Sequence, residues 1–379
     1  MKKSIRRGML AGLAASTAIV LAACGGGVTA GDSASPSGSG DGSGDTAAPA
    51  GELSGNLAGA GASAQGKAQE GWMAGFYDAE PGVTVSYDAV GSGGGREQFL
   101  AGGTLFAGTD SIFKEDEIAS ATDRCFGGEL IELPLYISPI AVIYNLPDTG
   151  VENIQLDAET IAKIFAGEIT SWDDAAIADQ NPDATLPATS ITVVNRSDDS
   201  GTTENFTEYL SEAGNGAWTE EPGDAWPIAS QQSGDGTSGM VTTVAAAEGA
   251  IGYADASQAG DLGTVALKVG EEYVPFSPAA AATAVDASPL TEDATEKRIT
   301  YALDRTTTAA GAYPLVLISY LAACDTYDNA GDAANVAAYL GYIASEAGQE
   351  RGSEAAGSAP ISSELRTQVE AAIEMISAS

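Results

Sequence analysis

Short apolar runs alternate with amphipathic stretches along most of the chain. The runs have the length of strands, whereas the amphipathic stretches repeat apolar residues three and four positions apart, as helices do. Predicted strands cover Val83–Tyr87, Leu130–Leu135, Ile140–Tyr144, Ile191–Val194, Ile251–Tyr253 and Leu315–Tyr320. Predicted helices include Ala158–Phe165, Asn205–Leu210, Met240–Ala247 and Val336–Ala347. This alternation predicts an α/β fold with largely parallel sheets and ligands at the carboxyl ends of strands.

The N-terminus has the pattern of an export signal. Basic residues precede an apolar run, Met9–Leu21, which is shorter than the ~20 apolar residues of a membrane-spanning helix. The run ends in Leu-Ala-Ala-Cys, which resembles the lipobox of bacterial lipoproteins. This resemblance implies a signal peptide over residues 1–23 and a lipid on Cys24. A plain signal peptide followed by a chance cysteine is the alternative.

Residues 24–51 predict a flexible tether, because Gly, Ser, Ala, Asp, Thr and Pro make up nearly all of this segment. Such a tether has a reach of roughly 30 Å. Lipid and tether together place the remaining chain at the outer face of the cytoplasmic membrane, an oxidising environment. The two other cysteines, Cys125 and Cys324, therefore more often form a disulfide than two free thiols.

Composition narrows the class of activity. The 379 residues include 16 Lys and Arg, 53 Asp and Glu and no histidine, for a net charge of -37. The lack of histidine excludes Ser-His and Cys-His catalytic pairs and histidine-ligated metal sites. Nucleic acid and anionic lipid surfaces are repelled by a chain this acidic, so we expect no nucleic-acid partner. The length suggests two domains.

Three short motifs match enzyme signatures incompletely. Gly61–Ala68 has the P-loop spacing, but Ala68 replaces the hydroxyl residue that would hold Mg²⁺. Gly234–Gly239 matches the dinucleotide-binding pattern, but no clear strand precedes it. Ser111–Lys114 matches the first motif of penicillin-binding enzymes without the two downstream motifs. We therefore expect no catalytic residue, no cofactor and no metal.

The segment after the strand Ile191–Val194 predicts an anion site. Apolar spacing places a helix start near Ser200–Thr202, where free backbone N–H groups, hydroxyls and a glycine favour an anion. Arg196 adds a permanent charge with a geometry suited to oxyanions. The alternative is a surface arginine paired with Asp198 or Asp199.

Three further segments carry related chemistry. Gly59–Ser63 and Gly91–Gly95 each combine glycines, which allow close approach of backbone, with a serine at an expected helix start. Taken singly, each serine is a helix cap. The segment Thr104–Asp110 ends a short apolar run with a carboxylate, which by itself is typical of a solvated loop acid.

Together these segments resemble the phosphate-binding protein of the bacterial high-affinity phosphate ABC transporter, over nearly all of residues 53–375. The likeness rests on GAGAS at 59–63, VGSGGG at 90–95, Asp110, WDDAAIADQNP at 172–182, NRSDDSGTT at 195–203 and GAIGY at 249–253. It implies phosphate ligands at Ser63, the backbone of Ala64, Ser92, Asp110, Arg196, Ser200, Gly201 and Thr202. Asp198 would buttress Arg196. The family often has Thr then Phe at positions 63 and 64, so we expect Ala64 to leave that wall more open.

The resemblance also implies a type II periplasmic-binding-protein fold, in which two crossing strands join two α/β lobes around a ligand cleft. The chain would cross near Tyr136–Ile137 and return near Tyr320. Lobe I would then comprise residues 52–136 and 320–379, and lobe II residues 137–319. The ligands up to Asp110 fall in lobe I and the others in lobe II. Both Cys125 and Cys324 fall in lobe I, which makes their disulfide reasonable.

The function implied is capture of inorganic phosphate by a monomeric protein that is not an enzyme, with delivery to the permease subunits of the transporter. As an ionised acceptor, Asp110 would pair only with an oxyanion that carries a proton. This argues against sulfate and molybdate, while an arsenate receptor stays open. An exported phosphatase is the alternative from another class, because a metal site built from carboxylates alone stays open too.

Overall fold

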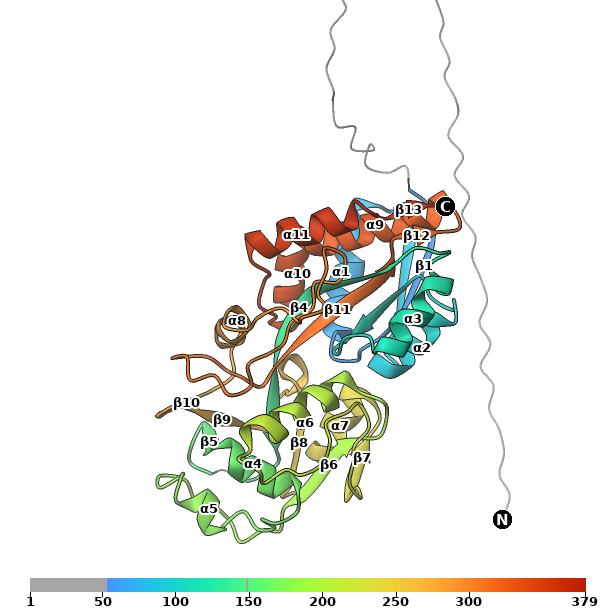
Figure 1. The fold of residues 1–379 in the computed structure, drawn as a ribbon. Coiled ribbons are helices and arrows are strands. Elements are labelled where there is room, and N and C mark those ends of the chain that lie inside the picture. The colour runs from blue at the N-terminus through green and yellow to red at the C-terminus, as the bar shows by residue number, and fades with distance from the viewer. Residues whose placement is uncertain (1–52, 148) are drawn as a thin grey trace, which may run out of the picture. The chain divides into compact units, whose positions relative to one another are not determined.

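The computed structural model describes residues 53–147 and 149–379 (Figure 1). The predicted signal peptide, the lipidation site Cys24 and the tether up to residue 51 lie outside the described residues. Among the helices of the described part, none has both the length and the apolar character that a membrane span needs.

Strands and helices alternate along the described chain. The strands are β1 (Gly55–Gly61), β2 (Val83–Asp88), β3 (Phe106–Thr109), β4 (Leu130–Tyr144), β5 (Asn153–Leu156), β6 (Thr192–Arg196), β7 (Gln232–Gly234), β8 (Ala250–Asp255), β9 (Gly263–Val269), β10 (Glu272–Val274), β11 (Val316–Cys324), β12 (Thr326–Tyr327) and β13 (Ser377–Ala378). The helices are α1 (Gly66–Ala79), α2 (Ser92–Leu100), α3 (Glu115–Arg124), α4 (Ala158–Phe165), α5 (Ala175–Ala178), α6 (Gly201–Ala213), α7 (Gly236–Ala246), the 3₁₀ helix η1 (Ala256–Gln258), α8 (Pro278–Asp286), α9 (Ala330–Ala344), α10 (Glu346–Ala356) and α11 (Ser363–Ile373).

The main sheet runs in the order β2-β1-β3-β11-β4-β8-β6-β7, and β9 joins it with β5 and β10. Pairing is parallel within β2-β1-β3 and within β8-β6-β7, but β11 is antiparallel to β3 and to β4, and β4 is antiparallel to β8. The expectation of largely parallel sheets is therefore only half right. The strands β4 and β11 lie between the two parallel parts and join them, and they run in opposite directions.

Strand β4 corrects the sequence prediction of two separate strands at Leu130–Leu135 and Ile140–Tyr144. The intervening residues include Pro139, which lacks an N–H group and interrupts the strand pattern, yet it pairs in register with Val316 of β11. All 15 residues of β4 are buried. Figure 1 shows β4 in green and β11 in orange passing from the elements of lobe I to those of lobe II.

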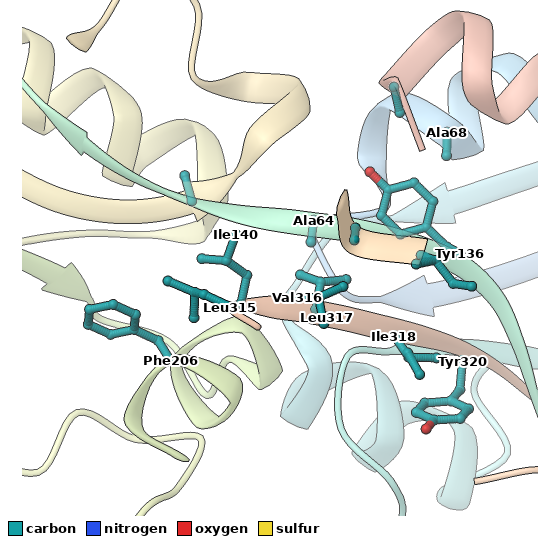
Figure 2. Close-up of a cluster of buried hydrophobic side chains, with 14 of the residues drawn as sticks. Ala64, Ala68, Tyr136, Ile140, Phe206, Leu315, Val316, Leu317, Ile318 and Tyr320 are labelled. Carbon is teal, nitrogen blue, oxygen red and sulfur yellow. The ribbon is translucent and has the colours of Figure 1, made fainter. Parts of the chain in front are cut away.

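A continuous apolar core surrounds these two strands. Figure 2 shows Tyr136 and Ile140 of β4 with Val316, Leu317, Ile318 and Tyr320 of β11, and all of these residues belong to one buried cluster. The Cys125–Cys324 disulfide, with the two Cα atoms 5.2 Å apart, joins the end of α3 to the end of β11, which confirms the predicted pairing. Residues 53–379 belong to one compact unit, so the lobe boundaries stay a prediction, and we keep the names lobe I and lobe II for the ranges given above.

The predicted helix Val336–Ala347 is wrong at its end. Helix α9 stops at Ala344, and Ser345 begins a new helix by accepting a hydrogen bond from the N–H of Gly348 at 3.1 Å. The apolar pattern runs across this junction, which hid the break. Helix α4 matches its predicted bounds, because the Asp157 side chain caps it and its apolar face is buried.

Candidate functional site

The first part of the site lies where the parallel strands of lobe I end. Gly61 of β1 pairs with Gly108 of β3, so the residues that follow the two strands emerge at the same edge of the sheet. Ser63 follows β1 and Asp110 follows β3 directly, while Ser92 is the first residue of α2. The carboxyl ends of parallel strands are where α/β folds bind ligands, and the sheet brings these three predicted residues to that edge.

Glycines let the loop 195–203 of lobe II approach this edge. Gly91 has a φ of 88°, and a Cβ added to it would lie 2.8 Å from the Asp199 carbonyl oxygen. The N–H of Gly93 donates to the same carbonyl at 3.1 Å. On the other side, a Cβ on Gly201 would lie 2.8 Å from Ser92 Oγ. The glycines of both motifs are therefore required by the close approach of the two segments.

The start of α6 supplies hydroxyls and free N–H groups, as predicted. Ser200 is the N-cap, and its Oγ accepts a hydrogen bond from the N–H of Thr203 at 3.3 Å. Thr202 Oγ1 donates to Asp110 Oδ2 at 2.9 Å, and Asn205 Nδ2 donates to the Asp110 carbonyl oxygen at 2.6 Å. Helix α6 is thus hydrogen-bonded directly to the end of β3.

Arg196 is buried at the end of β6 and is not a surface arginine, although it does pair with Asp198. Its Nε donates to Asp198 Oδ1 at 2.7 Å, and its Nη2 donates to Ser63 Oγ at 3.0 Å. Asp198 Oδ1 also accepts from the N–H of Gly236 at 3.0 Å. Burial acts to raise the pKa of Asp198, but the hydrogen bonds and charge of Arg196 hold that pKa below its ordinary value. The ionised Asp198 therefore orients the guanidinium toward lobe I.

Asp110 is buried, with 3% of its surface exposed, and is not a solvated loop acid. Its Oδ1 accepts from Ser319 Oγ at 2.5 Å, and its backbone N–H donates to Ser92 Oγ at 3.1 Å. Burial raises the pKa of Asp110, while hydrogen bonds from Ser319 and Thr202 and the charge of Arg196 act in the opposite direction. The site thus contains one carboxylate held among donors.

Ala64 follows Ser63 directly. It has no exposed surface and belongs to the same buried cluster as Val316 and Leu317 of β11. Figure 2 shows it beside that strand. The side chain of Ala64 is therefore part of the core, and its effect on the wall of the site stays a prediction.

Thr237 and Ser319 are among the residues that contact the predicted ligands and that sequence reasoning missed. The N–H of Thr237 donates to Ser63 Oγ at 3.0 Å, and its Oγ1 lies 3.0 Å from the same atom. Thr237 belongs to the glycine motif Gly234–Gly239, which appeared to lack a strand. The short strand β7 does precede it and α7 follows, so strand and helix flanked the motif after all. No sequence pattern indicated a role for Ser319 in the site, because it lies within an apolar strand.

A cluster of charges joins the lobes beside α6. The carboxylate of Asp224 accepts from Arg96 Nη2 at 2.9 Å and from Lys114 Nζ at 3.0 Å, both in lobe I. Its backbone carbonyl accepts from the N–H of Ser200 at 2.9 Å. Burial acts to raise the pKa of Asp224, but Lys114 and Arg96 hold it below its ordinary value. Arg96 also pairs with Glu117 at 3.0 Å.

Asp110 also lines a cavity of about 280 Å³ between α6 and β11. Of the predicted ligands only Asp110 lines it, and Glu204, Glu208 and Glu212 give it an acidic wall. This cavity is unsuited to an anion. Within residues 53–147 and 149–379, no three Asp, Glu or Cys side chains are grouped so that they could hold a metal ion.

Of the eight predicted ligands, the structure links Ser63 to Arg196, and it links both Ser92 and Thr202 to Asp110. The eight residues together offer hydroxyl and backbone donors, one guanidinium and a single carboxylate acceptor. Such a set matches a small oxyanion that accepts many hydrogen bonds and donates one.

Comparisons with known proteins agree with this chemistry. The phosphate-binding protein PstS 3 of Mycobacterium leprae is 34% identical over 264 residues, which cover 69% of this chain and 71% of the relative. The phosphate-binding protein PstS 2 of Mycobacterium tuberculosis is 32% identical over 319 residues, covering 82% and 84%. The crystal structure of a phosphate-binding protein from Stenotrophomonas maltophilia has a TM-score of 0.64 at 21% identity and covers 84% of this chain and 94% of that one, which supports the fold alone.

The family model described as the PBP superfamily domain matches residues 46–347. This match and the structural likeness confirm the predicted periplasmic-binding-protein fold. The chain belongs to the PBP superfamily and, within it, to the PstS phosphate-binding proteins.

Proposed function

We propose that this protein captures inorganic phosphate between its two lobes and delivers it to the permease subunits of a phosphate ABC transporter. The observation that carries the proposal is the buried Asp110, which is hydrogen-bonded to the start of α6. Asp110 lies at the same edge of the lobe I sheet as Ser63, and Ser63 is in turn hydrogen-bonded to Arg196. Its relatives named phosphate-binding proteins support the same ligand.

Phosphate would be held by the hydroxyls of Ser63, Ser92, Ser200 and Thr202, by the backbone N–H groups of Ala64 and Gly201, and by Arg196. In this structure Arg196 is hydrogen-bonded to Ser63, and both Ser92 and Thr202 are hydrogen-bonded to Asp110, so phosphate would replace those contacts with its own oxygens. Because the ligands come from both lobes, contacts to phosphate and between the lobes are complete only when the cleft is closed.

Selectivity would come from Asp110. As an ionised acceptor it pairs with the proton of HPO₄²⁻ or H₂PO₄⁻, whereas fully ionised sulfate would place two acceptors against each other. A site that leaves a buried polar group unpaired rejects the wrong ligand by roughly 10⁴ to 10⁵. Arsenate carries the same proton and is the alternative ligand that this chemistry admits.

The negative net charge is compatible with an anionic ligand. Charges on the protein surface are screened beyond ~8 Å at physiological salt, whereas the helix start and Arg196 act at contact distance in a buried site. The net charge of -37 therefore slows association more than it weakens affinity.

The proposal extends to where the protein is held and how it acts. The chain would be exported and held by a lipid on Cys24 at the outer face of the cytoplasmic membrane, with residues 24–51 as the tether. It would act as a monomer, without cofactor, metal or catalytic activity.

Calorimetric titration of ligand-free protein with phosphate, arsenate and sulfate tests the function. We expect one-to-one binding of phosphate at micromolar affinity or tighter and no heat with sulfate. Folded, demonstrably empty protein that binds none of the three would contradict the proposal. Hydrolysis of p-nitrophenyl phosphate by the pure protein would instead support the phosphatase alternative.

A further inference from the structure

A chain of buried hydrogen bonds leads from helix α9 to Asp110. Tyr339 Oη donates to Gln69 Oε1 at 2.8 Å, and Gln69 Nε2 donates to Gln65 Oε1 at 2.9 Å. Gln65 Nε2 donates to Ser319 Oγ at 2.5 Å, and Ser319 Oγ donates to Asp110 Oδ1 at 2.5 Å. All five side chains are at least 97% buried.

The donor-to-acceptor direction of this chain of hydrogen bonds is set by one backbone acceptor. Gln65 Nε2 also donates to the carbonyl oxygen of Tyr320 at 3.2 Å, and a carbonyl can only accept. This fixes the amide of Gln65 with its nitrogen toward β11. Ser319 must then accept from Gln65, so its single hydrogen is left for Asp110. Each donor polarises the next, which strengthens the last bond of such a chain.

The chain connects the strands and helices that build the site. Gln65 is the N-cap of α1, two residues after Ser63, and Ser319 lies on β11 where the register with β4 shifts. Asp110 is therefore hydrogen-bonded both to a crossing strand through Oδ1 and to lobe II through Thr202 at Oδ2. Neither contact leaves the carboxylate free to rotate.

We infer that the Tyr339–Gln69–Gln65–Ser319 chain is a positioning device for Asp110, which keeps Oδ1 an acceptor and holds the carboxylate in the ionised form that distinguishes proton-bearing oxyanions from fully ionised ones. The inference rests on the proposed function and deepens it, because it assigns selectivity to residues that do not touch the ligand.

Other charged and titratable groups act on Asp110 as well. Arg196 and Arg96 favour its ionised form, and Tyr87 interacts with it electrostatically. Glu204 lines the same cavity as Asp110. All four groups remain in a variant of Ser319, so a change there reports the loss of the donor alone.

The test compares Ser319→Ala, Tyr339→Phe and the control Ser138→Ala in the full chain. Ser138 is a fully buried serine on β4, the neighbouring crossing strand, and its hydroxyl contacts the Pro139 carbonyl at 3.4 Å and hydrogen-bonds to Asp255, not to Asp110. Phosphate and sulfate affinities are measured by calorimetry from neutral to mildly acidic pH. Thermal unfolding verifies that each variant is folded.

We expect Ser319→Ala to lower the ratio of phosphate to sulfate affinity about tenfold, the effect of losing a hydrogen bond to a charged group. Sulfate binding should begin at a higher pH than in the wild type, because Asp110 gains a proton more easily. Tyr339→Phe should change both readouts in the same direction by about twofold to threefold. Ser138→Ala should match the wild type.

Equal loss of phosphate and sulfate affinity in Ser319→Ala, with an unchanged pH profile, would overturn the inference by showing a merely structural role. If Ser319→Ala does not fold, Tyr339→Phe decides, and an unchanged ratio and pH profile there would overturn the inference. Wild-type protein that binds no phosphate would overturn the proposed function and this inference with it. If the wild type binds phosphate but the variants keep the wild-type affinity ratio and pH profile, only this inference is overturned.

Discussion

The carboxylate of Asp224 lies 2.9 Å from Nη2 of Arg96, and this ion pair ties a loop of lobe II to helix α2 of lobe I. The Arg96 side chain is 1% exposed and that of Asp224 17%, so water screens the pair little. Asp224 also accepts the N–H of Ser200 through its backbone carbonyl, so the same residue connects Arg96 to the start of α6.

Asp224→Asn is expected to weaken phosphate binding about tenfold to a hundredfold, because the proposed closed form loses an ion pair between the lobes and Arg96 keeps Glu117 as its carboxylate partner. Calorimetry measures the affinity. Glu221→Gln, an exposed acid in the same loop, is the matched control and should leave the affinity unchanged. An Asp224→Asn variant with wild-type affinity would show that the pair does not contribute to closure.

Asp110→Asn is expected to reduce the preference for phosphate over sulfate by about a hundredfold or more, because the amide can donate to an oxyanion without a proton. Competition titration with the two anions measures the ratio. Asp88→Asn provides the control, since Asp88 is an exposed acid at the end of β2. An unchanged ratio would remove Asp110 from the selectivity role.

Asp255 predicts a pH-dependent stability. Burial raises its pKa from 3.8 to about 6, although hydrogen bonds from Ser257 and Tyr136 oppose the rise. A raised pKa in the folded state means that protonation stabilises the fold, fully below pH 3.8, and that this stability is lost as pH rises through about 6.

In the neutral Asp255→Asn variant this loss should be absent. The free energy of unfolding, variant minus wild type, should increase on the order of 3 kcal/mol from acidic to neutral pH. Urea unfolding at several pH values measures it. The exposed Asp261→Asn should show no such trend, and a flat difference for Asp255→Asn would refute the assignment.

Removing the disulfide by replacing Cys125 and Cys324 with alanine should lower the free energy of unfolding by about 2–5 kcal/mol. The bond closes a loop with a sequence separation of 199, so it restricts the unfolded chain strongly. Denaturant unfolding measures the effect. Phosphate affinity should stay unchanged, because Cys324 pairs with Leu130 at the end of β4 and β11, away from Ser319. A large loss of affinity at intact stability would contradict this.

The local elements of the site were predictable because each depends on nearby residues. Ser200 caps α6 through a hydrogen bond three residues along the chain, and Arg196 pairs with Asp198 two residues on. The glycines around Ser92 likewise predicted a close approach of two backbone segments. Their common function followed only from the resemblance, since a serine at a helix start is usually just a cap.

Tertiary structure alone decided which distant residues complete the site. Ser319 lies 209 residues from Asp110 and Thr237 lies 174 residues from Ser63, separations at which a hydrogen bond leaves no periodic pattern in the sequence. The continuous strand β4 was hidden for a related reason, because burial along its whole length removes the polar positions that mark the ends of an element. The sequence by itself determined the α/β class, the starts of α4 and α6, the cysteine pairing and the charged and hydroxyl groups of the predicted site. Packing of β4 against β11 determined how those groups meet.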